Sequence, residues 1–270
     1  MNNIRLIISD LDGTLLNENH KLSLKTIEVL KQAQQRRIGV VLATGRSLKD
    51  LSVFGEQLDL SKYPLSGYIT LNGLELYDYK KKMISKHQRL TFKDVLIFNE
   101  VSLNYDIPLI LFYEKGGYLL NCQFIKKDYL VDTTELKKST LQQIEILNSE
   151  QLLKIVLCAQ ENDINRMLES LDEQFYQDYE ITRVESQWVE INPKGINKGL
   201  GIIEYLSYHH LKSEEIVVFG NGENDISMLN KTINSVVVEN AFESVKKHAN
   251  YLCESNINEG VAAFISKNIL

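Results

Sequence analysis

Short apolar runs alternate with amphipathic stretches at the start of the chain. Residues 4–9, 38–43 and 68–71 are apolar and have the length of strands. Such near-continuous runs are typical of parallel strands that are buried on both faces. Ser23 and Ser47 each precede a stretch whose apolar residues recur every three or four positions, the pattern of a capped helix with one buried face. These strand–helix units predict a parallel sheet.

The same alternation returns near residue 192 and continues to the end of the chain. Strands are predicted at residues 216–219, 235–238 and 251–253. Helices are predicted at residues 197–208, 223–230, 240–248 and 258–267. Together with the first part, these segments predict a Rossmann-like α/β core, a mainly parallel sheet with helices on both faces.

The middle of the chain has a different pattern. Helices are predicted at residues 91–105 and 163–176, and strands at residues 107–113, 118–124, 152–159, 181–186 and 188–191. This block is α+β and interrupts the strand–helix alternation. We therefore predict a core formed by residues 1–82 and 189–270, with an α+β domain, residues 83–188, inserted in it.

Composition excludes several classes of protein. The 270 residues carry 30 Lys and Arg against 36 Asp and Glu, a net charge of −6, which gives no overall attraction to nucleic acid or to an anionic membrane. No apolar run is long enough to span a bilayer, and the N-terminus lacks a secretory signal. The cysteines, Cys122, Cys158 and Cys253, lack disulfide or zinc spacing. We expect a cytoplasmic protein, and nothing implies a protein partner.

Four polar clusters follow predicted strands or open a helix. They are residues 10–14 (Asp-Leu-Asp-Gly-Thr), residues 44–46 (Thr-Gly-Arg), Lys198 with Gly199, and residues 220–225 (Gly-Asn-Gly-Glu-Asn-Asp). In an open α/β sheet, ligands bind beyond the carboxyl ends of the strands. The clusters would bring carboxylates, a cation, a hydroxyl and glycine amides to one edge of the sheet.

Phosphoryl transfer needs this mixture of groups. A nucleophile must reach phosphorus in line, while cations and N–H donors hold the equatorial oxygens. A carboxylate such as Asp10 can attack phosphorus, and a second carboxyl two residues later, Asp12, can exchange protons with the leaving group and with water. Magnesium favours oxygen ligands, so one or two carboxylates and a carbonyl suffice to bind it.

The order and spacing of the four clusters resemble the four motifs of the haloacid dehalogenase superfamily. Asp-x-Asp-Gly-Thr at 10–14, Thr-Gly-Arg at 44–46, Lys198 and Gly-x-Gly-x-Asn-Asp at 220–225 match them in order. The inserted block is similar to the C2-type cap of type-IIB, or Cof-type, members. The resemblance implies a Mg²⁺-dependent phosphatase with catalytic Asp10 and Asp12.

The resemblance also implies the binding groups. The transferring phosphoryl group would be held by Thr44, Gly45, Arg46, Lys198 and Asn224. The Mg²⁺ ligands and their support would be Asp10, the Asp12 carbonyl, Asn221 and Asp225. The family usually has an aspartate where this chain has Asn221, which affects metal affinity more than the nucleophile. Arg46 has a second interpretation, a structural pairing with a carboxylate. The histidines lack metal spacing and are expected at the surface.

The predicted function is hydrolysis of small phosphomonoesters, such as sugar phosphates or cofactor phosphates, through an aspartyl-phosphate. Two alternatives remain open at this point. A sugar phosphomutase would use the same Asp10 and Asp12 but keep the phosphate on a rebinding sugar. A non-catalytic regulatory protein would only bind a phosphorylated metabolite. Asn221 keeps this interpretation possible, because it stands where the family usually has an aspartate.

Overall fold

The computed structural model describes residues 1, 3–126, 136–147 and 151–270. They divide into two compact units. Unit 1 is Met1–His87 with Ile196–Leu270, and unit 2 is Gln88–Gly195.

Both boundaries between the units lie later in the chain than predicted. Unit 2 begins at Gln88 and ends at Gly195, whereas the predicted insert was residues 83–188. Strand β5 (Met83–Lys86) pairs with β4 (Glu75–Asp78), which keeps it in unit 1. Strand β11 (Trp188–Pro193) pairs with β9 (Leu152–Cys158) and β10 (Tyr179–Glu185), which keeps it in unit 2. The placement of residues 189–193 in the core is therefore wrong, because their backbone completes the second sheet.

Unit 1 contains an eight-stranded sheet in the order β14-β13-β12-β1-β2-β3-β4-β5. Neighbours from β14 to β3 are parallel, whereas β4 and β5 are antiparallel additions at one edge. The apolar side chains of β1 are fully buried on both faces, as its sequence predicts. The remaining strands are β1 (Leu6–Ser9), β2 (Gly39–Ala43), β3 (Gly67–Thr70), β12 (Ile216–Gly220), β13 (Ser235–Val238) and β14 (Tyr251–Cys253).

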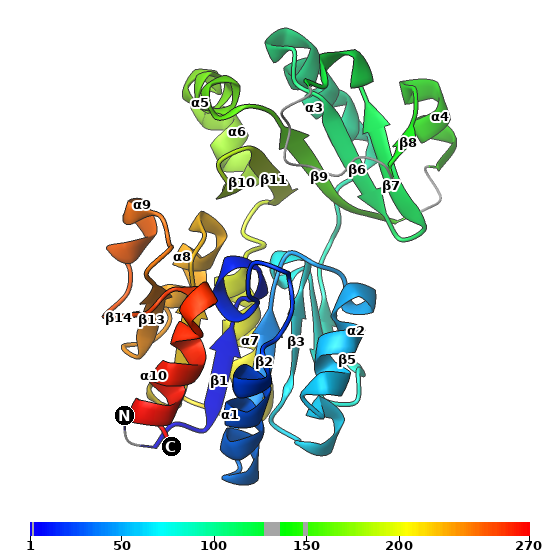
Figure 1. Cartoon of the computed structure of the whole chain (residues 1–270). Coiled ribbons are helices and arrows are strands. Elements are labelled where there is room, and N and C mark those ends of the chain that lie inside the picture. The colour runs from blue at the N-terminus through cyan, green and yellow to red at the C-terminus, as the bar shows by residue number, and fades with distance from the viewer. Residues whose placement is uncertain (2, 127–135, 148–150) are drawn as a thin grey trace. The chain divides into compact units, whose positions relative to one another are not determined.

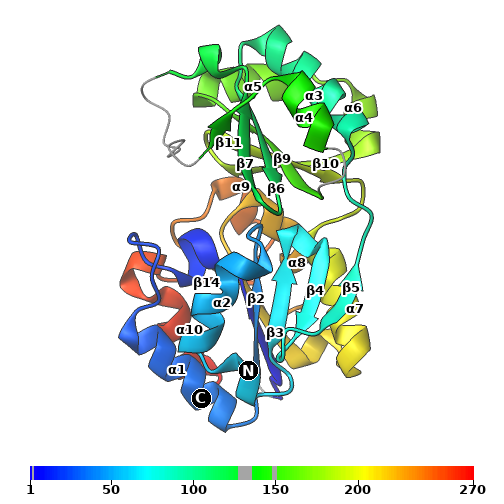
Figure 2. The same cartoon turned by 90° about the vertical axis from the view of Figure 1, so that its right-hand side faces the viewer.

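Helices cover both faces of this sheet. Figures 1 and 2 show α1, α2 and α10 on one face, and α7 and α8 on the other. The prediction of an α/β core with a mainly parallel sheet is confirmed. The helices are α1 (Leu24–Gln35), α2 (Leu48–Gln57), α7 (Lys198–His209), α8 (Ile226–Leu229), α9 (Glu243–Lys246) and α10 (Gly260–Asn268).

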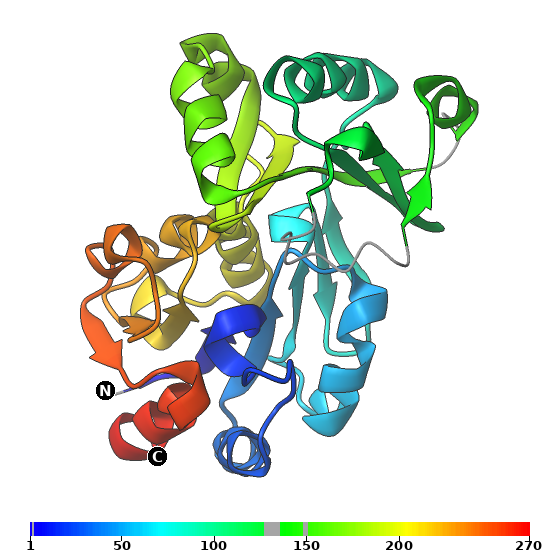
Figure 3. The ribbon, with the colours of Figure 1, turned by 45° about the horizontal axis from the view of Figure 1, so that its top comes forward.

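Unit 2 is α+β and contains a six-stranded sheet in the order β10-β11-β9-β6-β7-β8. All neighbours are antiparallel except β7 and β8. Helices gather on one face of this sheet, as Figure 3 shows for α3, α4 and α5. The elements are α3 (Phe92–Tyr105), β6 (Leu109–Tyr113), β7 (Gly116–Leu120), β8 (Lys137–Lys138), α4 (Leu141–Ile146), β9 (Leu152–Cys158), α5 (Glu161–Ser170), α6 (Glu173–Asp178) and β10 (Tyr179–Glu185).

The helix predicted over residues 163–176 is two helices. Leu171 has extended backbone angles, which ends α5. The Asp172 side chain then accepts a hydrogen bond from the Phe175 N–H, 3.3 Å, and caps α6. The apolar periodicity runs through the break, so it gave no sign of the new cap. In the described part of the chain, no helix has the length and apolar character needed to cross a membrane. The three cysteines are free.

Candidate active site

Asp10 is the first residue after β1, the strand that lies between β12 and β2. Its main-chain N–H donates to the Phe219 carbonyl oxygen, 2.9 Å away, so the chain leaves β1 while still tied to β12. The Asp10 side chain is buried, with the residue 5% exposed. Because β1, β2 and β12 are parallel, the loops that follow them meet at one edge of the sheet.

Lys198 opens α7 and is completely buried. The Asn197 side chain caps this helix, which fixes where Lys198 enters the site. Lys198 Nζ lies 2.7 Å from Asp10 Oδ1 and 2.6 Å from Asp225 Oδ1. Burial by itself lowers the pKa of Lys198, but the two carboxylates outweigh it and raise the pKa above the ordinary value. The side chain is therefore an ammonium held between two carboxylates.

Asp225 is fully buried and fixes the loop after β12. Its Oδ2 accepts the main-chain N–H groups of Asn221, 2.8 Å, and Gly222, 3.0 Å. Glycine at position 220 makes this possible, because a Cβ there would lie 2.6 Å from the Asp225 Cβ. The glycines of this motif thus let the loop close around a buried carboxylate.

The buried cluster of Asp10, Asp225 and Lys198 has an unusual charge balance. Burial and the charge of Asp225 raise the pKa of Asp10, Lys198 lowers it, and the result is about 7. With both carboxylates ionised, the cluster carries a net charge of −1. Such a site favours an added positive charge.

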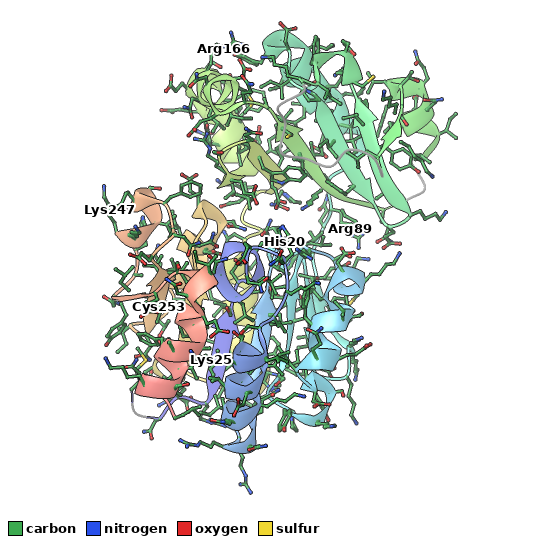
Figure 4. All side chains as sticks on the ribbon, viewed as in Figure 1. His20, Lys25, Arg89, Arg166, Lys247 and Cys253 are labelled. Carbon is green, nitrogen blue, oxygen red and sulfur yellow. The ribbon has the colours of Figure 1, made fainter. Side chains whose placement is uncertain are left out.

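Asp12 lies on the same loop and is bound by Arg46. Arg46 Nε is 2.8 Å from Asp12 Oδ2, and Arg46 Nη2 is 2.5 Å from Asp12 Oδ1, a bidentate pair. His20 Nδ1 lies 3.2 Å from the same Oδ1. Burial acts to raise the pKa of Asp12, but the hydrogen bonds and charges of Arg46 and His20 outweigh it and lower the pKa. In Figure 4, His20 lies at the end of unit 1 toward which β1 points in Figure 1.

The loops after β2 and β3 join the same network. Thr44 is buried, and its Oγ1 accepts the Arg46 N–H at 3.2 Å, with Gly45 between them in the loop. The Thr44 carbonyl oxygen accepts the Asn72 N–H at 2.9 Å. Asn72 Oδ1 in turn accepts a hydrogen bond from Asn224 Nδ2 at 3.3 Å.

The structure therefore connects all the predicted site residues, while the roles assigned to them stay predictions. Arg46 was predicted to bind phosphate, and the structure places its guanidinium on Asp12. This contact agrees with the second interpretation of Arg46. Gly45 joins the network through the chain, between Thr44 and Arg46, and Asn224 joins it through Asn72. The other residues of the network are Asp10, Asp12, Thr44, Arg46, Lys198, Asn221 and Asp225.

Three further residues contribute to the site, and none of them had a predicted role in it. His20 contacts Asp12, and Asn72 links Thr44 to Asn224. Asn240 Nδ2 donates to the Gly13 carbonyl oxygen at 2.8 Å. Asn72-Gly73 and residues 239–241 (Glu-Asn-Ala) match the Cof-type sequence pattern, but that match does not say which residues they contact. His20 lies in a polar loop and carries no sequence signal.

A divalent cation fits the residues present. Among the described residues, no three His, Cys, Asp or Glu side chains converge where they could together hold a metal ion. The ligands would instead be the carboxylates of Asp10 and Asp225, the Asp12 backbone carbonyl and the Asn221 amide oxygen. All are oxygen donors, which Mg²⁺ prefers, and the buried cluster is one positive charge short of neutral.

The sheet, the buried acidic cluster at its carboxyl edge and the second α+β unit define a class of α/β enzymes that carry their chemistry on the loops after parallel strands. The chain belongs to the haloacid dehalogenase-like hydrolases, whose family model matches residues 7–265. The family predicted from the motifs is confirmed, and the chain is a hydrolase of that family.

Full-length relatives agree with this assignment. The chain is 26% identical to the 5-amino-6-(5-phospho-D-ribitylamino)uracil phosphatase YcsE of Bacillus subtilis, over 99% of this chain and 96% of that protein. It is 25% identical to the subclass IIB sugar phosphatase BT4131, with a TM-score of 0.78 and coverage of 97% and 98%. The structure of SMU.1108c from Streptococcus mutans shares the fold, with a TM-score of 0.79, 23% identity and 98% coverage of both chains.

Proposed function

We propose that the chain is a Mg²⁺-dependent phosphatase that hydrolyses small phosphomonoesters through an aspartyl-phosphate on Asp10. The observation that carries the proposal is the buried ammonium of Lys198 between the carboxylates of Asp10 and Asp225. A cation in this position can hold both the nucleophile and a transferring phosphoryl group. Relatives named as phosphatases support the same chemistry.

In the first half of the reaction, an Asp10 carboxylate oxygen attacks phosphorus. The bond between phosphorus and the leaving oxygen breaks, and Asp12 donates its proton to that oxygen. Lys198, the Thr44 hydroxyl and the Gly45 amide would hold the equatorial oxygens. Bound Mg²⁺ would supply positive charge that offsets the charge developing on those oxygens.

In the second half, water attacks the phosphorus of the aspartyl-phosphate. Asp12 accepts the proton of this water, the bond between phosphorus and Asp10 breaks, and inorganic phosphate leaves. The Arg46 pair stabilises the carboxylate form of Asp12, the form that this half needs. In the first half, Asp12 must hold a proton, so its contact with Arg46 must loosen.

We infer that the substrates are sugar phosphates or cofactor phosphates such as pyridoxal phosphate or flavin mononucleotide. The test is a panel of such esters with inorganic phosphate as the readout, in Mg²⁺ and in EDTA. We expect release of one phosphate per ester consumed, and a large loss of rate in EDTA. Substoichiometric release with an isomerised sugar phosphate would indicate a phosphomutase. No release from any ester, including an activated aryl phosphate, would contradict the proposal.

Arg46 gives a prediction that separates its two interpretations. If Arg46 positions Asp12, R46M should lower kcat by about 10²-fold, since general acid–base catalysis supplies effects of that size. R46M also removes the hydrogen bonds and the positive charge that lower the pKa of Asp12, so this pKa should rise. The part of the kcat–pH profile that reports the Asp12 carboxyl should therefore move to higher pH. The measurement is kcat and KM from pH 5 to 9 on the preferred ester.

The conservative variant R46K keeps the charge but loses the bidentate fork, so we expect partial recovery of kcat. A different result would assign Arg46 to the substrate. If R46M raises KM while kcat and its pH profile stay at parent values, the arginine binds phosphate and does not position Asp12.

A further inference from the structure

The proposed mechanism assigns no proton transfer and no phosphate contact to the side chain of Asn221. We propose that its neutral amide favours binding of the phosphate anion at the expense of the divalent cation. The inference rests on the proposed function only in taking phosphate as the anion. It is carried by two observations, the charge of the buried cluster and the orientation of the Asn221 side chain.

The first observation is electrostatic. Asn221 contacts Asp225, which forms a buried cluster with Lys198 and Asp10 whose net charge is −1 when both carboxylates are ionised. The Asn221 N–H binds the Asp225 carboxylate, 2.8 Å away, so a charge at position 221 would lie close to this cluster. A carboxylate there would attract the cation and repel a phosphate dianion, and both interactions are strong in a buried site. The neutral amide avoids that repulsion.

The second observation is the orientation of the amide. Asn221 Oδ1 accepts the Thr14 hydroxyl at 2.7 Å, so one of the two lone pairs of the oxygen that could coordinate a metal is already used. Asn221 Nδ2 faces Gly13, since a Cβ at that glycine would lie 2.5 Å from it. Gly13 also has a φ of +74°, so the backbone conformation and the closeness of Asn221 both favour glycine at this position.

This arrangement leaves a hydrogen-bond donor available. Among the described residues, Asn221 Nδ2 has no acceptor, and Asn221 as a whole is only partly buried. An amide N–H can donate to an oxygen of phosphate but offers nothing to a cation. Charge and orientation therefore act in the same direction, toward the anion.

The test measures binding of each ion without turnover. In N221D, which keeps the shape and adds a charge, we expect Mg²⁺ to bind about tenfold more tightly and inorganic phosphate, in EDTA, about tenfold more weakly. In N221S, which stays neutral and loses the amide, we expect phosphate to bind several-fold more weakly, with Mg²⁺ binding within about threefold of the parent. Isothermal titration calorimetry gives both constants.

Q35E is the matched control for added charge, because Gln35 is exposed at the last turn of α1. We expect both constants of Q35E to stay within about threefold of the parent, and circular dichroism reports folding of each variant. Unchanged or tighter phosphate binding in folded N221D would overturn the inference. A parent that neither binds phosphate nor releases it from any ester would overturn the proposed function instead.

Discussion

Asp10→Asn is expected to lower turnover by about 10⁴-fold or more, because loss of a covalent nucleophile removes effects of that size. The amide is nearly isosteric with the carboxylate, so Lys198 keeps an oxygen acceptor and the fold stays intact. Asp225 is bound by Lys198 and two main-chain N–H groups, and Asp12 is bound by Arg46, so we expect neither to replace Asp10 as the nucleophile. Phosphate release from the preferred ester is the measurement.

The same variant has a stability signature in metal-free protein. The Asp10 pKa is about 7 in the folded protein against 3.8 as the ordinary value, so the folded state binds more protons between these pH values. The parent's free energy of unfolding should therefore fall as pH rises from about 4 to 7. D10N lacks this loss, so at pH 8 its free energy of unfolding should exceed the parent's by on the order of 2–4 kcal/mol.

Urea denaturation in EDTA at pH 4 and pH 8 checks that difference, which should shrink toward pH 4. Two results would contradict the assignment. The first is undiminished activity of D10N, which would remove Asp10 as the nucleophile. The second is a stability difference that does not depend on pH, which would show that the Asp10 carboxyl does not titrate as its surroundings imply.

Lys198→Met should lower both stability and activity, with a larger loss of stability than any other variant proposed for this site. The variant leaves Asp10 and Asp225 buried without their shared cation, and breaking a buried ion pair costs about 3–5 kcal/mol. One carboxyl would then keep a proton at neutral pH, which also removes a charge needed in catalysis. We expect a loss of activity of about 10³-fold or more, from the charge that stabilises the transition state.

Chemical denaturation and phosphate release measure the two effects of K198M. K49M is the matched control, because Lys49 is exposed on α2 and its removal should change neither quantity by much. Adding Mg²⁺ should recover part of the lost stability, since a second cation can bind the two carboxylates. A K198M protein as stable as the parent would mean that the ion cluster is not formed in solution.

The sequence predicted which residues meet at the edge of the sheet, but not how they pair. Apolar runs located β1, β2 and β12, and strand ends then placed the motifs near one another. The pairing of Lys198 with Asp10 spans 188 positions and depends on how α7 packs on the sheet. No local pattern encodes that packing.

Residues outside the motifs were the hardest to predict. His20 adopts a φ of +53°, and its N–H donates to the Asn17 carbonyl oxygen at 2.9 Å. That turn brings the imidazole back to Asp12, although its polar sequence is typical of any exposed loop. The end of the inserted segment was misplaced for a related reason, because only the pairing of β11 with β9 and β10 assigns its residues to unit 2.

The central position of β1 has a consequence for synthesis of the protein. β1 lies between β2 and β12, so one of its edges stays unpaired until residues 216–220 emerge from the ribosome. An unpaired apolar strand edge invites pairing with other chains. The nascent chain therefore carries an aggregation hazard through most of translation, and a product truncated before Lys198 would hold Asp10 without its cation. From this order of strands we expect C-terminally truncated chains to aggregate and to lack activity.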